Sequence, residues 1–249
     1  LIPARMSSSR LPRKALADVH GKPRGVRAAE QAAKSRAVRV VVATDHEEIF
    51  AACQAHNIEV VMTGEYHESG TTRLAEAAQL LGLSADTVVV NVQGDEPLID
   101  PQLVDQTAAV LVENGAPMAT AAHEIHDFDE FMNPNVVKVV LCRQGRALYF
   151  SRAPIAYPRD SMRAGERTLP QADAPLRHIG IYAYRAGFLN EYAQMSASPL
   201  ENIESLEQLR VLWHGHPIAV EIVAQAPAAG VDTQEDLERV RAVFQKVAQ

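Results

Sequence analysis

Apolar and polar positions alternate in blocks along the chain, and these blocks predict strands separated by helices. Short apolar runs rich in β-branched residues predict strands, at residues 38–43, 59–62, 87–92, 136–141 and 218–223. Longer segments with apolar residues three or four positions apart predict helices, at residues 26–35, 47–56, 72–81, 101–114, 203–214 and 233–247. This order predicts an α/β fold, with a mostly parallel sheet and helices on both of its faces.

Two segments depart from that rhythm. Residues 150–175 are rich in Pro, Arg and Asp and have little periodicity, so they predict a long loop, and long loops in compact domains are usually functional or mobile. The pair Leu1-Ile2 resembles the end of an apolar strand, so a few residues are expected to precede it in the native protein.

Composition narrows the classes of function. The 249 residues suffice for one large domain, and 47% of them are hydrophobic. The net charge of −7 provides no basic field for a nucleic-acid backbone, so no nucleic-acid partner is expected. No apolar run approaches the roughly 20 residues that span a bilayer, so no membrane association is expected. The two cysteines form no metal spacing or disulfide framework, which favours a reducing cytoplasm.

Ligands of open α/β sheets bind beyond the carboxyl ends of the strands, so the loops after strands are candidate sites. Residues 3–14 contain four cations and three serines. Small residues allow backbone N–H groups to approach a ligand, and the cations suit phosphate. A solvated basic loop is the alternative interpretation, and the glycines of a Walker loop are absent.

Acidic and hydroxyl residues follow other strands. Asp95 comes directly after the most apolar strand, where a carboxylate can hold a hard divalent cation, although a polar turn is the alternative. Asp232 precedes the last helix, where an ordinary helix cap is the commoner role. Residues 67–73 form a hydroxyl-rich turn that opens a helix, whose N-terminus can accept an anion or a polar ligand, although an ordinary helix cap is the commoner role. Alternation in residues 177–182 places His178, Gly180 and Tyr182 on one strand face.

Taken together, these stretches resemble the 3-deoxy-manno-octulosonate (Kdo) cytidylyltransferases, also called CMP-Kdo synthetases, over essentially the whole chain. The stretches that carry the resemblance are Ile2-Pro3-Ala4-Arg5, Ser9-Arg10-Leu11-Pro12, Val42-Ala43-Thr44-Asp45-His46, Ser69-Gly70-Thr71, Asn91-Val92-Gln93-Gly94-Asp95-Glu96-Pro97, Asn133-Pro134-Asn135-Val136-Val137-Lys138, Leu148-Tyr149-Phe150-Ser151-Arg152, Arg177-His178-Ile179-Gly180-Ile181-Tyr182, Leu206-Glu207-Gln208-Leu209-Arg210 and Gly230-Val231-Asp232-Thr233. No one stretch is decisive, but so many in the right order are specific.

The resemblance implies a fold, a reaction and an assembly. The fold would be a Rossmann-like nucleotide-binding sheet in a single nucleotidyltransferase domain over residues 1–249, with a smaller dimerisation lobe inserted at about residues 133–184. The reaction would convert CTP and Kdo to CMP-Kdo and pyrophosphate, with Mg²⁺ as cofactor, for lipopolysaccharide biosynthesis. A homodimer is also implied.

By the matching motif positions, the resemblance also implies roles for individual residues. The nucleotide would contact Arg5, Ser8, Arg10, Lys14, Ser69 and Arg73. Mg²⁺ would be held by Asp95 and Asp232, and the catalytic residues would be Arg10, Lys14 and Asp95. The sugar pocket would be lined by Gln93, Arg152, His178, Tyr182, Glu207 and Gln208, with Arg152 or His178 recognising the sugar carboxylate.

Two departures from the family pattern leave alternatives open. Arg13 and Ala15 stand where the family loop has Gly and Pro, and Arg24-Gly25 stands where apolar residues normally open a helix, so a weaker helix start is expected. The alternatives are a cytidylyltransferase for another acidic sugar, such as a sialic acid, and a non-catalytic CTP-binding homologue. An NAD-type oxidoreductase is set aside because no Gly-x-Gly-x-x-Gly follows the first strand.

Overall fold

The computed structural model describes residues 1–6, 13–170, 172–228, 230–231 and 233–247. Its strands are β1 (Ile2–Ala4), β2 (Asp18–Val19), β3 (Lys22–Pro23), β4 (Val41–Thr44), β5 (Glu59–Met62), β6 (Val88–Asn91), β7 (Met118–Glu124), β8 (Lys138–Leu141), β9 (Ala147–Ser151), β10 (Leu176–Arg185) and β11 (Ile218–Ile222).

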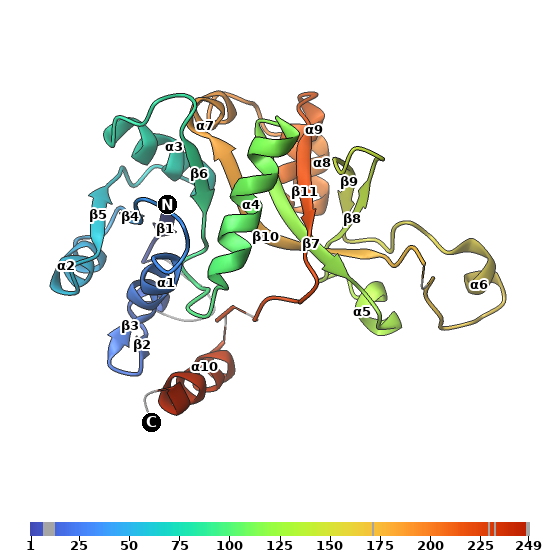
Figure 1. Cartoon of the computed structure of the whole chain (residues 1–249), viewed down its shortest axis with the longest axis horizontal. Coiled ribbons are helices and arrows are strands. Elements are labelled where there is room, and N and C mark those ends of the chain that lie inside the picture. The colour runs from blue at the N-terminus through green and yellow to red at the C-terminus, as the bar shows by residue number, and fades with distance from the viewer. Residues whose placement is uncertain (7–12, 171, 229, 232, 248–249) are drawn as a thin grey trace.

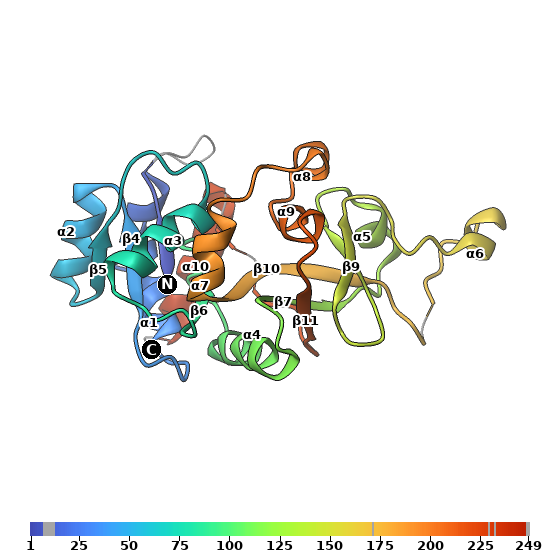
Figure 2. The ribbon, with the colours of Figure 1, turned by 90° about the horizontal axis from the view of Figure 1, so that it is seen from above.

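Helices cover both faces of the sheet, as predicted (Figure 2). They are the 3₁₀ turn η1 (Lys14–Leu16) and the α-helices α1 (Arg24–Ala32), α2 (Glu47–Ala55), α3 (Gly70–Leu80), α4 (Pro101–Asn114), α5 (Phe128–Met132), α6 (Arg159–Arg163), α7 (Ala186–Tyr192), α8 (Pro199–Glu204), α9 (Gln208–Trp213) and α10 (Gln234–Val247). Helices α1 and α4 pack on one side of the sheet, and α3 and α7 pack on the other.

The prediction of a mostly parallel sheet is wrong for half of the molecule. Strands β1, β4 and β5 are parallel, and backbone bonds between Leu1 and both Val90 and Val92 place β6 beside β1. Strand β10, however, runs antiparallel to β6, β7 and β8, and only β11 pairs with β7 in parallel. Antiparallel strands need no helical crossover between them, so β10 can enter the sheet directly from the preceding loop.

Strand β10 joins the main sheet to a projecting arm, which consists of β8, β9 and the segment from β9 through α6 to the start of β10. One of its edges pairs with β7, while the other pairs first with β8 and then with β6. The predicted loop at residues 150–175 runs out from β9 through the short helix α6 and back into β10 (Figure 1). Residues 133–184, assigned above to a dimerisation lobe, therefore include this arm and most of β10, whose last residues belong to the main sheet.

The side chains of β10 alternate between two cores. Ile179 and Ile181 face the cluster that contains residues of α1 and α4, whereas Tyr184 faces the cluster formed by α3, α7 and α9. Leu74 of α3 is also fully buried in this second cluster. The two helical layers thus pack on opposite faces of β10, and this packing fixes the register of the strand.

The packing of α3 predicts a contrast between two leucines of the same helix. Leu74→Ala removes a side chain with no exposed surface and should lower the free energy of unfolding by about 2–5 kcal/mol. Leu80→Ala removes a side chain that is 56% exposed and should change it by less than about 0.5 kcal/mol. Urea unfolding followed by circular dichroism measures both, and equal losses would contradict this description of the core.

Candidate functional site

The ends of four neighbouring strands lie at one edge of the sheet. Because β5, β4, β1 and β6 run in the same direction, their following residues Thr63, Asp45, Arg5 and Asp95 all come from this edge. A hollow of about 620 Å³ lies elsewhere: its apolar lining includes the first residues of β4 and β6, at the opposite edge. The predicted site and that hollow are therefore separate.

Two predicted catalytic residues contact each other at this edge. The Lys14 ammonium donates to the Asp95 carboxylate over 2.9 Å, and their side chains are 15% and 34% exposed. Arg13 directly before Lys14 has a φ of 54°, in the left-handed region that favours glycine. Arg13 thus adopts a backbone conformation that favours glycine, and its guanidinium pairs with Glu48.

The loop before the last helix meets the Asp95 loop. The Val231 N–H donates to the Asp95 carbonyl over 2.8 Å, and Gly230 lies against the same carbonyl. Asp232 itself lies outside the described residues, as do Ser8 and Arg10 of the first loop. The two predicted metal-binding loops are thus in contact through their backbones, while the metal-binding role of Asp232 stays a prediction.

The carboxylates of this loop have the chemistry that a hard cation needs. Glu96 follows Asp95, and its Oε2 atom is buried with no hydrogen-bond partner among the described residues. Burial, followed by the negative charge of Asp95, raises the pKa of Glu96 to about 7. Within the described part of the chain no three His, Cys, Asp or Glu side chains form a ready metal cluster. Asp95 and Glu96 are therefore oxygen donors that fit Mg²⁺ but require a further ligand.

Two predicted nucleotide contacts have structural roles. Ser69 caps α3, since its hydroxyl accepts the Thr72 N–H over 3.2 Å. Arg73 is only 2% exposed, pairs with Asp45, and donates to the Thr63 hydroxyl over 2.6 Å. Arg73 therefore ties the loops after β4 and β5 to α3, and its direct contact with a nucleotide stays a prediction.

A second group of predicted residues surrounds the arm end of β10. The His178 ring lies 4.9 Å from the Phe150 ring and 5.5 Å from the Tyr182 ring, and its Nε2 atom is 2.9 Å from the Thr120 hydroxyl. Tyr182 pairs in register with Asn91 of β6, two residues before Gln93. The predicted sugar-pocket residues thus come from β10, which carries His178 and Tyr182, and from the loop after its neighbour β6, which carries Gln93.

The His178 ring is uncharged in the free structure. The surrounding protein removes water from the ring and lowers the pKa of His178 to about 3, so the imidazole is neutral at physiological pH. Its ring nitrogens can donate or accept one hydrogen bond each, and recognition of a sugar carboxylate by His178 stays a prediction.

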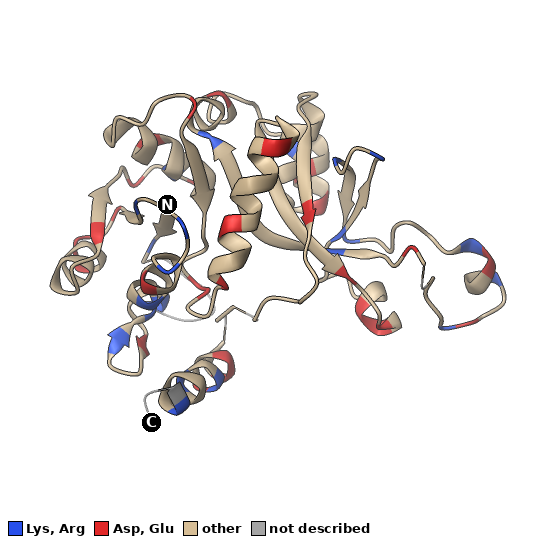
Figure 3. Cartoon of the chain, in the orientation of Figure 1, with Lys and Arg blue, Asp and Glu red and all other residues tan. Residues whose placement is uncertain are grey.

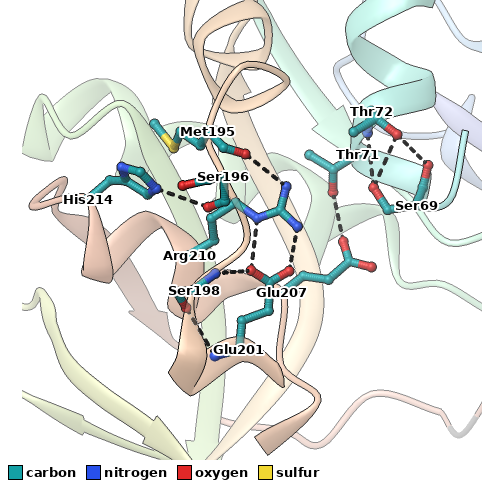
Figure 4. A network of polar contacts seen from close by, with 10 residues as sticks. All are labelled: Ser69, Thr71, Thr72, Met195, Ser196, Ser198, Glu201, Glu207, Arg210 and His214. Carbon is teal, nitrogen blue, oxygen red and sulfur yellow. Dashed lines mark hydrogen bonds and ion pairs between the residues drawn. The ribbon is translucent and has the colours of Figure 1, made fainter. Parts of the chain in front are cut away.

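Glu207 and Gln208 belong to the same region as Tyr182. Glu207 keeps exposed surface, but its carboxylate points toward Thr71 over 3.5 Å (Figure 4). Loss of water raises the pKa of Glu207 above its usual value, while the Arg210 cation, the Thr71 hydroxyl and, least of all, Arg5 act in the opposite direction. Gln208 is 4% exposed, and its amide nitrogen has no partner among the described residues. The contact with Thr71 therefore joins the Glu207–Gln208 turn to the first turn of α3.

An ion pair not anticipated from the sequence supports the Glu207–Gln208 turn. Arg210 donates to both carboxylate oxygens of Glu201, over 2.9 and 2.6 Å (Figure 4). Glu201 also closes the capping box of α8 with Ser198. Left-handed Ser205 interrupts the single helix predicted at residues 203–214, and the resulting turn presents Glu207. In the sequence, the one sign of this network is Arg210, which ends the matched stretch Leu206–Arg210.

Arg152 is fixed by α8 rather than directed into open space. Its guanidinium donates to the carbonyls of Glu204 over 2.6 Å and Pro134 over 3.1 Å. The Glu204 carboxylate in turn accepts the Arg152 N–H over 2.9 Å and the Ser151 hydroxyl over 2.7 Å. Because these carbonyls carry no net charge, the Arg152 cation is not neutralised, so recognition of a sugar carboxylate by Arg152 stays a prediction.

Comparison with known proteins places this geometry in a family. The profile of the family described as "Cytidylyltransferase" matches residues 1–222. A 3-deoxy-manno-octulosonate cytidylyltransferase of Neisseria gonorrhoeae (strain NCCP11945) is 74% identical over 247 residues, which are 99% of this chain and 98% of the relative. The protein of the same name from Herminiimonas arsenicoxydans is 62% identical over 98% of this chain and 97% of the relative.

Solved structures agree with these relatives. The structure of CMP:2-keto-3-deoxy-manno-octonic acid synthetase complexed with CTP has a TM-score of 0.88 and 41% identity, and the match covers 99% of this chain and 97% of that one. A cytidylyltransferase from Leptospira borgpetersenii shares the fold, with a TM-score of 0.61 at 16% identity over 98% of this chain and 85% of that one.

The neutral His178 predicts a dependence of stability on pH. Its pKa of about 3 lies below the value of about 6.5 expected in the unfolded chain, so the unfolded state binds the extra proton and stability falls as the pH drops through 6.5. Between pH 6.5 and 5.5 the native protein should lose about 1 kcal/mol more than the variant His178→Gln. Urea unfolding measures this difference.

The control for that measurement is the interval from pH 7.5 to 8.5. There the imidazole is neutral in both folded and unfolded chains, so the two proteins should lose or gain stability in parallel. Parallel curves between pH 6.5 and 5.5 would show that His178 is protonated in the folded protein, contrary to this description.

Proposed function

The chain belongs to the 3-deoxy-manno-octulosonate cytidylyltransferases, and from that premise we propose how its own residues divide the work of the reaction. The protein converts CTP and Kdo to CMP-Kdo and pyrophosphate. In this reaction the sugar hydroxyl oxygen bonds to the α-phosphorus, the bond from that phosphorus to the bridging oxygen breaks, and the hydroxyl proton leaves. The product would serve lipopolysaccharide biosynthesis in the cytoplasm.

The contact between Lys14 and Asp95 is the observation that carries the proposed mechanism. Transfer of a phosphoryl-type group depends on positioning and on neutralising charge rather than on a protein nucleophile. Lys14 and Arg5 are cations of the first loop and would stabilise the charge that grows on the triphosphate. Ser8 and Arg10 of the same loop are proposed to bind the phosphates with them.

Asp95 and Asp232 are proposed to hold Mg²⁺, with Glu96 beside them. When bound, the ion would activate the attacking hydroxyl and stabilise the leaving pyrophosphate. The support is the pair of acidic residues Asp95 and Glu96, of which the Glu96 Oε2 atom is buried, and the Val231 N–H that joins their loop to the second loop. In the free protein Lys14 compensates the Asp95 charge, and this lysine would turn toward the phosphates once Asp95 has another cation to bind.

The sugar would lie between β10 and the Glu207–Gln208 turn. The Gln208 amide nitrogen has no partner among the described residues and could donate to the sugar. Tyr182 and His178 could form hydrogen bonds with it from β10, and Gln93 could do so from the loop after β6. Burial and nearby negative groups raise the pKa of Tyr182 well above its usual value, so its hydroxyl is a stable donor. No observation favours a sialic acid or a non-catalytic homologue over this assignment.

Removing the Asp95 charge should stop the reaction without unfolding the protein. Asp95→Asn is expected to lower kcat for pyrophosphate release from CTP and Kdo by at least about 100-fold. Asp100→Asn is the matched control. Asp100 lies in the same loop as Asp95 and is the N-cap residue of α4, where Asn caps a helix equally well. The proposed role of Asp95 would be abandoned if both variants kept their activity, or if the native enzyme turned over equally well in chelator.

A homodimer formed through the arm is the proposed assembly. On the arm, Leu148 is 62% exposed and Tyr157 is 61% exposed. Large apolar side chains that are exposed in this way commonly contact a partner, so the arm is the proposed interface.

The charged residues do not form a surface suited to nucleic acid. In Figure 3 acidic and basic residues are mixed, and α6 and α10 each carry both signs, so no basic face is visible in this view. None of the described helices combines the length and apolar character that crossing a bilayer requires.

Light scattering tests the assembly. Native protein should have twice the chain mass, and Leu148→Glu should produce the single-chain mass because a charge would be buried at the interface. Ile203→Glu is the control, since Ile203 is 79% exposed but belongs to α8, outside the arm. A dimer that survives Leu148→Glu, or a monomeric native protein, would contradict the proposed interface.

A further inference from the structure

Arg24 is a buried cation that the family resemblance does not explain. It begins α1, is only 4% exposed, and departs from the apolar residues that normally open this helix. Its Nη1 atom donates to the Val231 carbonyl over 2.7 Å, which joins segments 207 residues apart. Arginine is almost never so buried unless it has a specific partner, so the position of this partner indicates what the side chain does.

The Val231 residue is held from three directions. Its carbonyl accepts from Arg24, its N–H donates to the Asp95 carbonyl over 2.8 Å, and its side chain has no exposed surface. That side chain packs in a cluster with Val19, Leu237 and Val240. The residue immediately before Asp232 is therefore fixed to the Asp95 loop on one side and to α1 on the other.

The start of α1 also contacts the element that carries Lys14. The Arg24 N–H donates to the Ala17 carbonyl over 2.9 Å, and the Ala17 N–H donates to the Lys14 carbonyl over 3.3 Å. The backbone of Gly25 lies beside Ala15, because a Cβ added to Gly25 would be 3.5 Å from the Ala15 carbonyl oxygen. Arg24 thus connects directly to the Lys14 turn through its backbone and to Val231 through its side chain.

We infer that Arg24 is a positioning residue for the cytidylyl transfer, which holds the peptide before Asp232 against the loop of Asp95 and the turn of Lys14. This inference deepens the proposed function and rests on it for the roles of those three residues. Residues that orient metal ligands without touching the ion commonly change metal affinity by about 10–100-fold when they are removed. This role requires a long side chain that ends in a hydrogen-bond donor to the Val231 carbonyl.

A neighbouring arginine provides a matched control. Arg27 lies on the same helix and donates to the carbonyls of Val19 over 3.1 Å and His20 over 2.7 Å, and its guanidinium stacks over the Phe244 ring at 4.7 Å. It therefore anchors α1 to the β2–β3 hairpin and α10 without reaching Val231. If Arg24 were a purely structural anchor, its removal would resemble the removal of Arg27.

The first test uses hydrogen exchange in the metal-free protein. In Arg24→Met the amide of Val231, which bonds to Asp95, should exchange at least about tenfold faster, because local opening becomes easier when a charged hydrogen bond is lost. Arg27→Met should leave that exchange unchanged, and Arg24→Lys, which keeps a donor, should lie between Arg24→Met and the native protein. Should Arg24→Met fail to fold, Arg24→Lys alone must still accelerate exchange at Val231.

The second test measures Mn²⁺ binding by electron paramagnetic resonance. Arg24→Met should weaken binding by about tenfold, and Arg27→Met should not change it even if it lowers Tm. Unchanged exchange and Mn²⁺ affinity in Arg24→Met, or equal losses in Arg27→Met, would overturn the inference. A native protein that makes no CMP-Kdo would instead contradict the proposed function, while the exchange comparison would still decide whether Arg24 positions the loop.

Discussion

The ion pair between Lys14 and Asp95 is the interaction on which the rest of the site depends. It places a cation of the first loop 2.9 Å from a carboxylate of the loop after β6, at the edge where the parallel strands end. An unpaired Asp95 carboxylate would be costly beside Glu96, because burial and then the charge of Asp95 already raise the pKa of Glu96. In the free protein Lys14 and Asp95 therefore neutralise each other. In the proposed mechanism they separate when Lys14 binds the triphosphate and Asp95 binds the divalent ion.

Strand β10 gives this edge a second wall. Because it runs antiparallel to both β6 and β7, it brings His178 and Tyr182 from the arm beside the residues that follow β6. The wall is uncharged: His178 is neutral, and Tyr182 keeps its proton. Phosphate charge would then be handled on the β1 side by Lys14 and Arg5, while the β10 side offers hydrogen bonds to a sugar. This division of the site follows from the directions of the strands.

Local patterns predicted most elements but not the direction of the sheet. The strand at residues 59–62 is confirmed. The alanine-rich strand β7 was missed, because Met118–Glu124 has Thr120 as its one β-branched residue and is buried on both faces instead of alternating. The mixed sheet was missed as well, since alternation of strands and helices says nothing about a strand that returns from an arm.

The sequence also predicted some features of the site and missed others. Motif positions pointed to Lys14 and Asp95, which contact each other, and to Tyr182 and Glu207, which lie near each other. They did not distinguish contact residues from supports such as Arg73 and Ser69. That distinction depends on long-range partners, for example Asp45 for Arg73, which spacing alone does not reveal. Arg24 is the clearest case, because it looked like a weak helix start and is instead a buried link across the fold.

The most direct measurement of the central claim is a crystal structure with CTP and Mn²⁺, in which anomalous scattering locates the ion. The account predicts oxygen atoms of both Asp95 and Asp232 at about 2.0–2.2 Å from one ion that also contacts the triphosphate, with Lys14 turned from Asp95 to a phosphate. An ion bound elsewhere, or the two carboxylates facing different cavities while Lys14 stays on Asp95, would contradict it.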